Sequence, residues 1–203
     1  MKTIKDFDFK NKKALVRVDF NVPQDENLNV TDNTRIVAVK PTVDKILADG
    51  GSVILMTHLG RPKGEVNDKY SLKHILSEVS KVLGQDVKFV EESVGEKAEQ
   101  AAAELQAGEI LLLENLRFQP EEEKGDVAFA EKLSKLGDAY VNDAFGTAHR
   151  AHASTAGVTK FVKTTAVGYL MQKEIQFLGN AVEDPVRPFV AILGGAKVAD
   201  KDR

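Results

Sequence analysis

Short apolar runs alternate along this chain with longer stretches in which apolar residues recur every three or four positions. Because the runs contain few polar residues, they predict strands that are buried on both faces of a sheet. Five of them lie at residues 13–18, 53–56, 87–90, 110–113 and 139–141. The stretches between them have helical spacing, so strands and helices alternate. This alternation predicts a three-layer α/β/α fold with a parallel, Rossmann-like sheet.

Capping and breaking residues indicate where the predicted helices begin and end. Asp32 is the expected N-cap of the first helix, and Pro41 inside that helix predicts a kink or a start one turn later. The apolar face of this helix carries Ile36, Val39, Val43, Ile46 and Leu47. A second helix is predicted over residues 71–83, with Gly84 as its stop.

Two further helices have recognisable start signals. Ser93 and Glu96 match a capping box ahead of an Ala-rich helix that runs to about residue 105. Asp126 is the expected cap of a helix that ends near Gly137. The charged run at residues 121–124 is interpreted as a solvated loop that leads into this helix.

After residue 166 the pattern changes. Apolar residues at helical spacing predict one more helix, and Pro185 and Pro188 bracket a stiff connector. A new strand is expected at residues 189–193, followed by the glycine loop at 194–197. A strand that leads into such a loop is typical of the first unit of a second α/β domain, so we expect the chain to be truncated.

Composition limits the possible functions. The chain has 203 residues, of which 42% are hydrophobic and 29% charged, and its net charge of −3 argues against bulk binding to nucleic acid or membranes. It contains no cysteine, which excludes disulfides and thiolate metal sites. The first residues do not resemble a signal sequence, so a cytoplasmic location is expected.

Polar segments follow four of the predicted strands, and three of these segments carry an arginine. Since the carboxyl ends of parallel strands form one crevice, Arg61, Arg117 and Arg150 are expected to converge there. A guanidinium binds phosphate or carboxylate oxygens two at a time. For one arginine a surface salt bridge is the simpler interpretation, but three after separate strands favour an anion pocket.

Other candidate residues leave alternatives open. Asp19 and Asn21 suit either ligand hydroxyls or an Asx turn, and His58 suits either a ligand contact or a structural role. Arg35, judged by position alone, is interpreted as a solvated helix residue. His74 is expected to be structural, and His152 is expected to brace its loop. The glycine loop could present backbone N–H groups to a phosphate, or be a plain turn.

Five segments, in order, resemble the signature segments of the phosphoglycerate kinase family. They are Val16-Arg17-Val18-Asp19-Phe20-Asn21-Val22-Pro23, Thr57-His58-Leu59-Gly60-Arg61-Pro62, Leu113-Glu114-Asn115-Leu116-Arg117-Phe118, Asn142-Asp143-Ala144-Phe145-Gly146-Thr147-Ala148-His149-Arg150 and Gly194-Gly195-Ala196-Lys197-Val198. The resemblance implies a glycolytic kinase that transfers a phosphoryl group reversibly between 1,3-bisphosphoglycerate and ADP, giving 3-phosphoglycerate and ATP, with Mg²⁺ carried on the nucleotide.

The resemblance also implies roles for particular residues. Arg35 and Lys197 correspond to catalytic positions, and Gly194, Gly195, Lys197 and Lys201 to nucleotide-binding positions. The 3-phosphoglycerate site would comprise Asp19, Phe20, Asn21, Arg35, His58, Leu59, Gly60, Arg61, Arg117 and Arg150. No dedicated metal ligand is expected in this chain.

The resemblance further implies a domain organisation. Residues 1–168 would form the 3-phosphoglycerate-binding domain, residues 169–188 an interdomain helix and hinge, and residues 189–203 the start of the nucleotide-binding domain. We therefore expect a monomer that is inactive as this fragment. The alternative is a standalone anion-binding or interaction module without turnover. A dinucleotide-binding protein is disfavoured, because no G-x-G-x-x-G follows the first strand.

Overall fold

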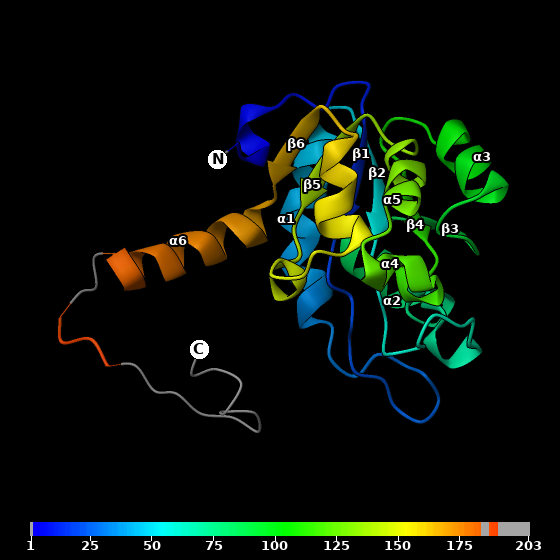
Figure 1. The fold of residues 1–203 in the computed structure, drawn as a ribbon, viewed down its shortest axis with the longest axis horizontal. Helices are drawn as coiled ribbons and strands as arrows, with labels where there is room; N and C mark the ends of the chain where they lie inside the picture. The colour runs from blue at the N-terminus through cyan, green and yellow to red at the C-terminus, as the bar shows by residue number, and fades with distance from the viewer. Residues whose placement is uncertain (1, 184–186, 191–203) are drawn as a thin grey trace. The chain divides into compact units, whose positions relative to one another are not determined.

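The computed structural model describes residues 2–183 and 187–190. Within them, six parallel strands form one sheet in the order β3-β4-β2-β1-β5-β6 (Figure 1). The strands are β1 (Lys13–Arg17), β2 (Ser52–Met56), β3 (Val87–Val90), β4 (Ile110–Leu113), β5 (Ala139–Asn142) and β6 (Thr164–Val167). The five expected strands are confirmed. β6 was not expected, because this edge strand is only partly buried and half of its residues are threonine.

Helices cover both faces of the sheet, as predicted. The α-helices of the described residues are α1 (Thr34–Ala48), α2 (Leu76–Leu83), α3 (Glu96–Glu104), α4 (Pro120–Lys124), α5 (Val127–Ser134) and α6 (Tyr169–Glu183). Alternate residues of each central strand point to opposite faces, so that Val16 packs with α1 and α2 while Leu15 packs with α3 and α5. Two apolar cores therefore enclose the central strands of the sheet.

The structure corrects three predictions about the starts of two helices, α1 and α3. The N-cap of α1 is Asn33 rather than Asp32, whose Oδ1 accepts from the backbone of Thr34 at 2.8 Å. The helix then continues through Pro41, so a start one turn later is wrong. The Ser93 capping box is also wrong: α3 begins after Gly95, and no side chain caps it.

The helix predicted over residues 71–83 is shorter than expected. A 3₁₀ turn at Asp68–Tyr70 precedes the predicted range, a second 3₁₀ turn covers Leu72–His74, and only Leu76–Leu83 is α-helical. Buried Glu114 accepts hydrogen bonds from Ser71 Oγ at 2.6 Å and from Leu72 N at 2.9 Å. These tertiary bonds hold the chain in a tighter turn than the helical pattern alone favours. Gly84, with φ of 77°, ends α2 as predicted.

The chain divides into two compact units, Met1–Gln172 and Lys173–Arg203. The first contains the whole sheet and both cores. The second contains most of α6, whose Phe177, Leu178 and Val182 are exposed. The predicted boundaries at residues 168 and 188 stay predictions, and most of the expected strand at 189–193 lies outside the described residues. Among the helices described, none has the length and apolar character needed to span a bilayer.

Candidate functional site: an arginine-rich cavity

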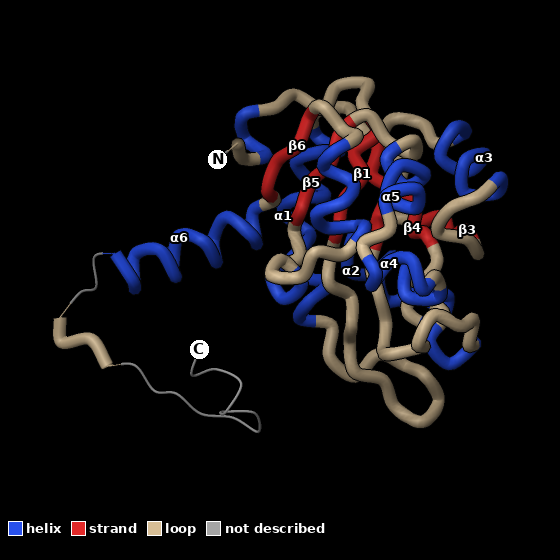
Figure 2. Tube along the Cα trace, in the orientation of Figure 1, coloured by secondary structure: helices blue, strands red, loops and turns tan. Residues whose placement is uncertain are grey.

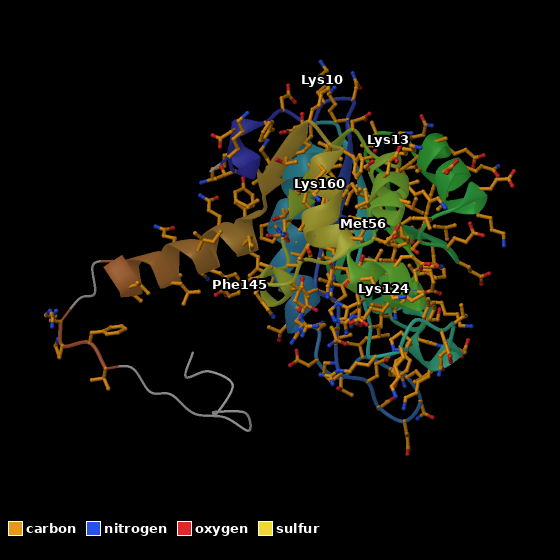
Figure 3. The ribbon with its side chains drawn as sticks, in the orientation of Figure 1. Lys10, Lys13, Met56, Lys124, Phe145 and Lys160 are labelled. Carbon is orange, nitrogen blue, oxygen red and sulfur yellow. The ribbon has the colours of Figure 1, made fainter. Side chains whose placement is uncertain are left out.

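A cavity of about 640 Å³ opens among the loops that follow β1, β2, β4 and β5. Figure 2 shows long loops that leave the sheet at the carboxyl ends of its strands. In Figure 3, Phe145 and Lys124 lie toward this end of the sheet, and Lys10 and Lys13 lie toward the opposite end. The position agrees with the rule that parallel α/β sheets bind ligands at their carboxyl ends. The lining residues are Asp19, Asn21, Arg35, His58, Gly60, Arg61, Lys63, Arg117, Glu123, Gly146, Thr147 and Arg150.

Hydrogen bonds between loops hold the cavity wall together. The amide of Phe20 donates to Thr57 Oγ1 at 2.8 Å, and the amide of Gly60 donates to Asn21 Oδ1 at 2.8 Å. These bonds join the loop after β1 to the loop after β2. Buried Asn115 adds the loop after β4, since its Nδ2 donates to Leu59 O at 2.8 Å. Three separate segments are thereby fixed in one wall.

Gly60 occupies a position that requires glycine. Its φ is 62°, in the left-handed region, and a Cβ there would overlap the ring of Tyr70. The backbone of Gly60 also receives a hydrogen bond, because Arg117 NH1 donates to its carbonyl at 3.0 Å. The glycine thus lets the chain pass close to the ring and present its carbonyl to the arginine.

Two of the four cavity arginines have carboxylate partners. Arg35 NH1 lies 2.7 Å from Asp19 Oδ2, and Arg117 Nε lies 3.2 Å from Glu123 Oε1. No such partner lies within 4 Å of Arg61 or Arg150 in the described part of the chain. Counting Lys63, five cationic side chains share the cavity with two carboxylates. The cavity therefore has a positive potential suited to an anion with more than one charge.

A buried polar network supports the wall from behind. Arg17, at the end of β1, is almost wholly buried, and its Nε donates to Ser154 Oγ at 2.8 Å. Glu122, on α4 and 1% exposed, accepts from the Ser154 hydroxyl and from Ser154 N at 3.0 Å. The expectation that residues 121–124 are a solvated loop is therefore wrong, because they form α4 and Glu122 faces inward. Thr155, next in the chain, donates to the Arg150 carbonyl at 2.7 Å.

His58 lies between this network and the cavity. It is 5% exposed, and its Nδ1 is 3.4 Å from Arg17 NH2. Burial, followed by the nearby charges of Arg17, Arg117 and Arg150, lowers the pKa of His58 to about 2. The ring is therefore neutral at physiological pH. With Nδ1 as the acceptor of the Arg17 hydrogen bond, the proton resides on Nε2, which can donate to an anion.

The structure brings most of the predicted substrate-binding residues together. The exceptions are Phe20 and Leu59, whose side chains are buried in the apolar core. His152 is buried with its Nδ1 3.8 Å from Glu122 Oε1, in agreement with a role in bracing its loop. His74 Nε2 is 2.9 Å from Asp68 O, a structural contact. Gly194, Gly195, Lys197 and Lys201 lie outside the described residues.

Sequence reasoning missed Lys63, Glu123, Gly146 and Thr147, which line the cavity, and Arg17, which supports it. Lys63 lies in the loop that follows β2, so the rule that identified the arginines applies to it too, whereas Glu123 lies on α4, which was expected to be a solvated loop. Arg17 gave no such signal, because it is part of a strand. Among the described residues, no group of three or more His, Asp or Glu side chains is placed to hold a metal ion.

The fold and the cavity define an α/β protein with a positively charged cavity at the carboxyl end of its parallel sheet. The family model described as phosphoglycerate kinase matches residues 4–202. The chain therefore belongs to the phosphoglycerate kinase family.

Relatives agree with this assignment. The phosphoglycerate kinase of Moorella thermoacetica is 57% identical over 199 residues, which is 98% of this chain and 50% of the relative. The cytosolic phosphoglycerate kinase of Nicotiana tabacum is 54% identical over 98% of this chain and 49% of its own length. The crystal structure of the Pyrococcus horikoshii phosphoglycerate kinase superposes with a TM-score of 0.88 at 36% identity, covering 98% of this chain and 50% of that one. The chain thus spans about half the length of the relatives it matches.

Proposed function

We propose that this chain is the acceptor-binding half of a phosphoglycerate kinase and that its cavity holds 3-phosphoglycerate. In the complete reaction, an oxygen of the 3-phosphoglycerate carboxylate takes the terminal phosphoryl group of ATP, giving 1,3-bisphosphoglycerate and ADP, and the reverse reaction forms ATP. Mg²⁺ enters with the nucleotide as part of the substrate. The observation that carries the proposal is the convergence of Arg35, Arg61, Arg117 and Arg150 from separate segments on one cavity.

The geometry supports a division of roles within the cavity. Arg61, Arg117 and Arg150, with the Nε2–H of neutral His58, would bind the phosphate at carbon 3. Asp19 and Asn21 would hold the hydroxyl at carbon 2. Arg35 would lie near the carboxylate and neutralise charge on the transferring phosphoryl group, a role worth about 10³–10⁵ in rate in other phosphoryl-transfer enzymes. This role fits Arg35 because its side chain is half exposed and held at one NH group by Asp19.

The remaining elements of the proposal concern the complete protein. Lys197 would act near the transferred phosphoryl group, and Gly194, Gly195 and Lys201 would contact the nucleotide. Residues 1–168 would form the acceptor domain, with residues 169–188 as interdomain helix and hinge and residues 189–203 as the start of the nucleotide domain. We propose that the protein is a monomer. We also propose a cytoplasmic location, which is in line with the name of the tobacco relative.

Isothermal titration calorimetry with 3-phosphoglycerate tests this proposal. We expect binding to the unmodified chain and a loss of about tenfold or more in affinity for Arg35→Ala and Arg150→Ala, because each removes a charge-assisted contact worth roughly 1.5–3 kcal/mol. Lys132→Ala, on the exposed side of α5, removes the same charge outside the cavity and should leave the affinity unchanged. A folded chain that releases no heat and shows no affinity would contradict the proposal.

A coupled assay with ATP and 3-phosphoglycerate separates binding from catalysis. Since these 203 residues span about half the length of their relatives, we expect them to bind the acceptor without turnover. Turnover by the isolated chain would contradict that expectation. Binding of phosphate and sulfate as tight as that of 3-phosphoglycerate would favour a general anion-binding module instead.

A further inference from the structure

Glu123 is an unexpected residue in a cavity built for an anion. It follows the buried Glu122 on α4, but its side chain is 46% exposed and lines the cavity. Its Oε1 lies 3.2 Å from Arg117 Nε. The separation is that of an ion pair, yet Arg117 Nε makes no hydrogen bond within the described residues. Glu123 therefore neutralises Arg117 by charge, without a directed bond to its Nε–H.

Arg117 does not need Glu123 to keep its position. Its guanidinium is anchored by the bond from NH1 to the Gly60 carbonyl at 3.0 Å, and its backbone amide donates to Asn115 Oδ1 at 3.1 Å. The side chain is only 7% exposed and thus held by its surroundings. Glu123, by contrast, lies near the end of a five-residue helix, directly before Lys124 and Gly125. The carboxylate is the more exposed partner of the pair.

We propose that Glu123 is a built-in counterion of the cavity, which occupies Arg117 when no ligand is bound and lowers the affinity for multiply charged anions. This inference rests on the proposed function, since it concerns the same cavity. A phosphate dianion that approaches Arg117 must displace the carboxylate or tolerate its charge. The repulsion grows with the charge of the ligand. Glu123 therefore weakens binding of phosphorylated ligands more than binding of singly charged carboxylates.

Glu123→Gln tests this inference, because glutamine keeps the shape of the side chain and removes its charge. We expect about three- to tenfold tighter binding of 3-phosphoglycerate and of inorganic phosphate by calorimetry, the size expected for one unit charge in a partly solvated cavity. Binding of D-glycerate, which lacks the phosphate, should change less. The affinity of the variant should also fall more steeply with added salt.

Two control variants isolate the effect. Glu123→Asp retains the negative charge and should bind 3-phosphoglycerate within about twofold of the unmodified chain. Glu104→Gln makes the same change in net charge on the exposed end of α3 and should leave the affinity unchanged. Circular dichroism and thermal unfolding would check that each variant is folded.

The outcomes distinguish this inference from the proposed function. If the unmodified chain binds 3-phosphoglycerate but Glu123→Gln binds it equally well or more weakly, the counterion role is overturned, and weaker binding would show that Glu123 instead holds Arg117. An equal gain in Glu104→Gln would also overturn it, because the effect would then come from net charge. If the unmodified chain binds neither 3-phosphoglycerate nor phosphate, the proposed function fails and the inference falls with it.

Discussion

The imidazole of His58 lies between the buried guanidinium of Arg17 and the open cavity, and its surroundings keep it neutral. Its neighbours on the cavity side are arginines, so protonation would add a positive charge where several already lie. A neutral ring can still donate from Nε2 to an anion. The residue thus acts as a hydrogen-bond donor without charge, and its contribution to folding depends on pH.

The depressed pKa of His58 predicts loss of stability in mild acid. Below pH 6.5, the usual pKa of histidine, the unfolded chain takes up a proton that the folded chain takes up only near pH 2. The stabilisation is therefore complete above pH 6.5 and declines as the pH falls. We expect the free energy of unfolding to drop between pH 7 and pH 5 by about 2 kcal/mol more in the unmodified chain than in His58→Gln.

Urea denaturation at the two pH values measures this difference. His149→Gln, which replaces an exposed histidine beside the cavity arginine Arg150, serves as the control and should keep the full pH dependence. Burial also lowers the pKa of His152, which adds a slope of the same sign to every variant. Equal slopes in all three proteins would contradict the assignment of a depressed pKa to His58.

At the scale of elements, α4 gives two neighbouring glutamates opposite roles. Glu122 points inward, where it accepts two hydrogen bonds from Ser154 and is the main opposite charge for Arg17. Glu123 points to the cavity. The five-residue helix α4 therefore has two roles. It supports the segment that carries Arg150, and it contributes a negative charge to the cavity.

Removal of the inward carboxylate should be costly. Glu122→Ala leaves the Arg17 charge buried without its partner, so we expect a loss of about 3–5 kcal/mol in the free energy of unfolding. Ser154→Ala should cost about 1–3 kcal/mol, because buried donors and acceptors lose their partner. Urea denaturation gives both values. Glu123→Gln, one position along, should stay within about 0.5 kcal/mol; a similar loss there would show that α4 is merely intolerant of substitution.

The elements that could be predicted from the sequence are those determined by residues close together in the chain. β1, β2 and β4 each contain a continuous apolar run, and Asp126 caps α5 by accepting a 2.8 Å hydrogen bond from Phe129 N, as its sequence position indicates. The α4 helix and the 3₁₀ turns were missed because distant partners decide them. Glu122 accepts a hydrogen bond from Ser154, 32 residues later, and the amide of Leu72 donates to Glu114, 42 residues later. No window of sequence contains such pairs.

The residues of the candidate site also fall into two groups, those that could be predicted from the sequence and those that only the fold brings to the cavity. The arginines after β2, β4 and β5 could be expected from the order of strands and the charge of the loops. Arg35 could not, because it lies on α1 and reaches the cavity only through the fold, where Asp19 holds it. The family resemblance supplied it. Arg17 looked like an ordinary strand residue until the structure placed Ser154 beside it.

At the scale of the whole molecule, the proposed binding of 3-phosphoglycerate would be coupled to folding. The cavity is formed by loops from four strands, so an unfolded chain has no comparable site. With 3-phosphoglycerate at 100 times its dissociation constant, we expect the free energy of unfolding of the sheet-containing unit to rise by about 2.7 kcal/mol. Thermal unfolding at increasing ligand concentration would follow this rise. D-Glycerate at the same concentration should stabilise less, and equal stabilisation by both would contradict a role for the phosphate.

The pairing of β1 with β5 has a consequence for synthesis. Lys13 at the start of β1 bonds to Asp138, 125 residues later, and Ala14 lies opposite Ala139 in the sheet. On the ribosome, β1 emerges early but must wait for β5 before it acquires that neighbour. Asp19 and Arg35 are therefore made long before Arg150 can join them. If the cavity binds the anion as proposed, a nascent chain would reach its full affinity only once the segment beyond β5 has left the exit tunnel. Ligand binding during synthesis would then report that β1 has paired with β5.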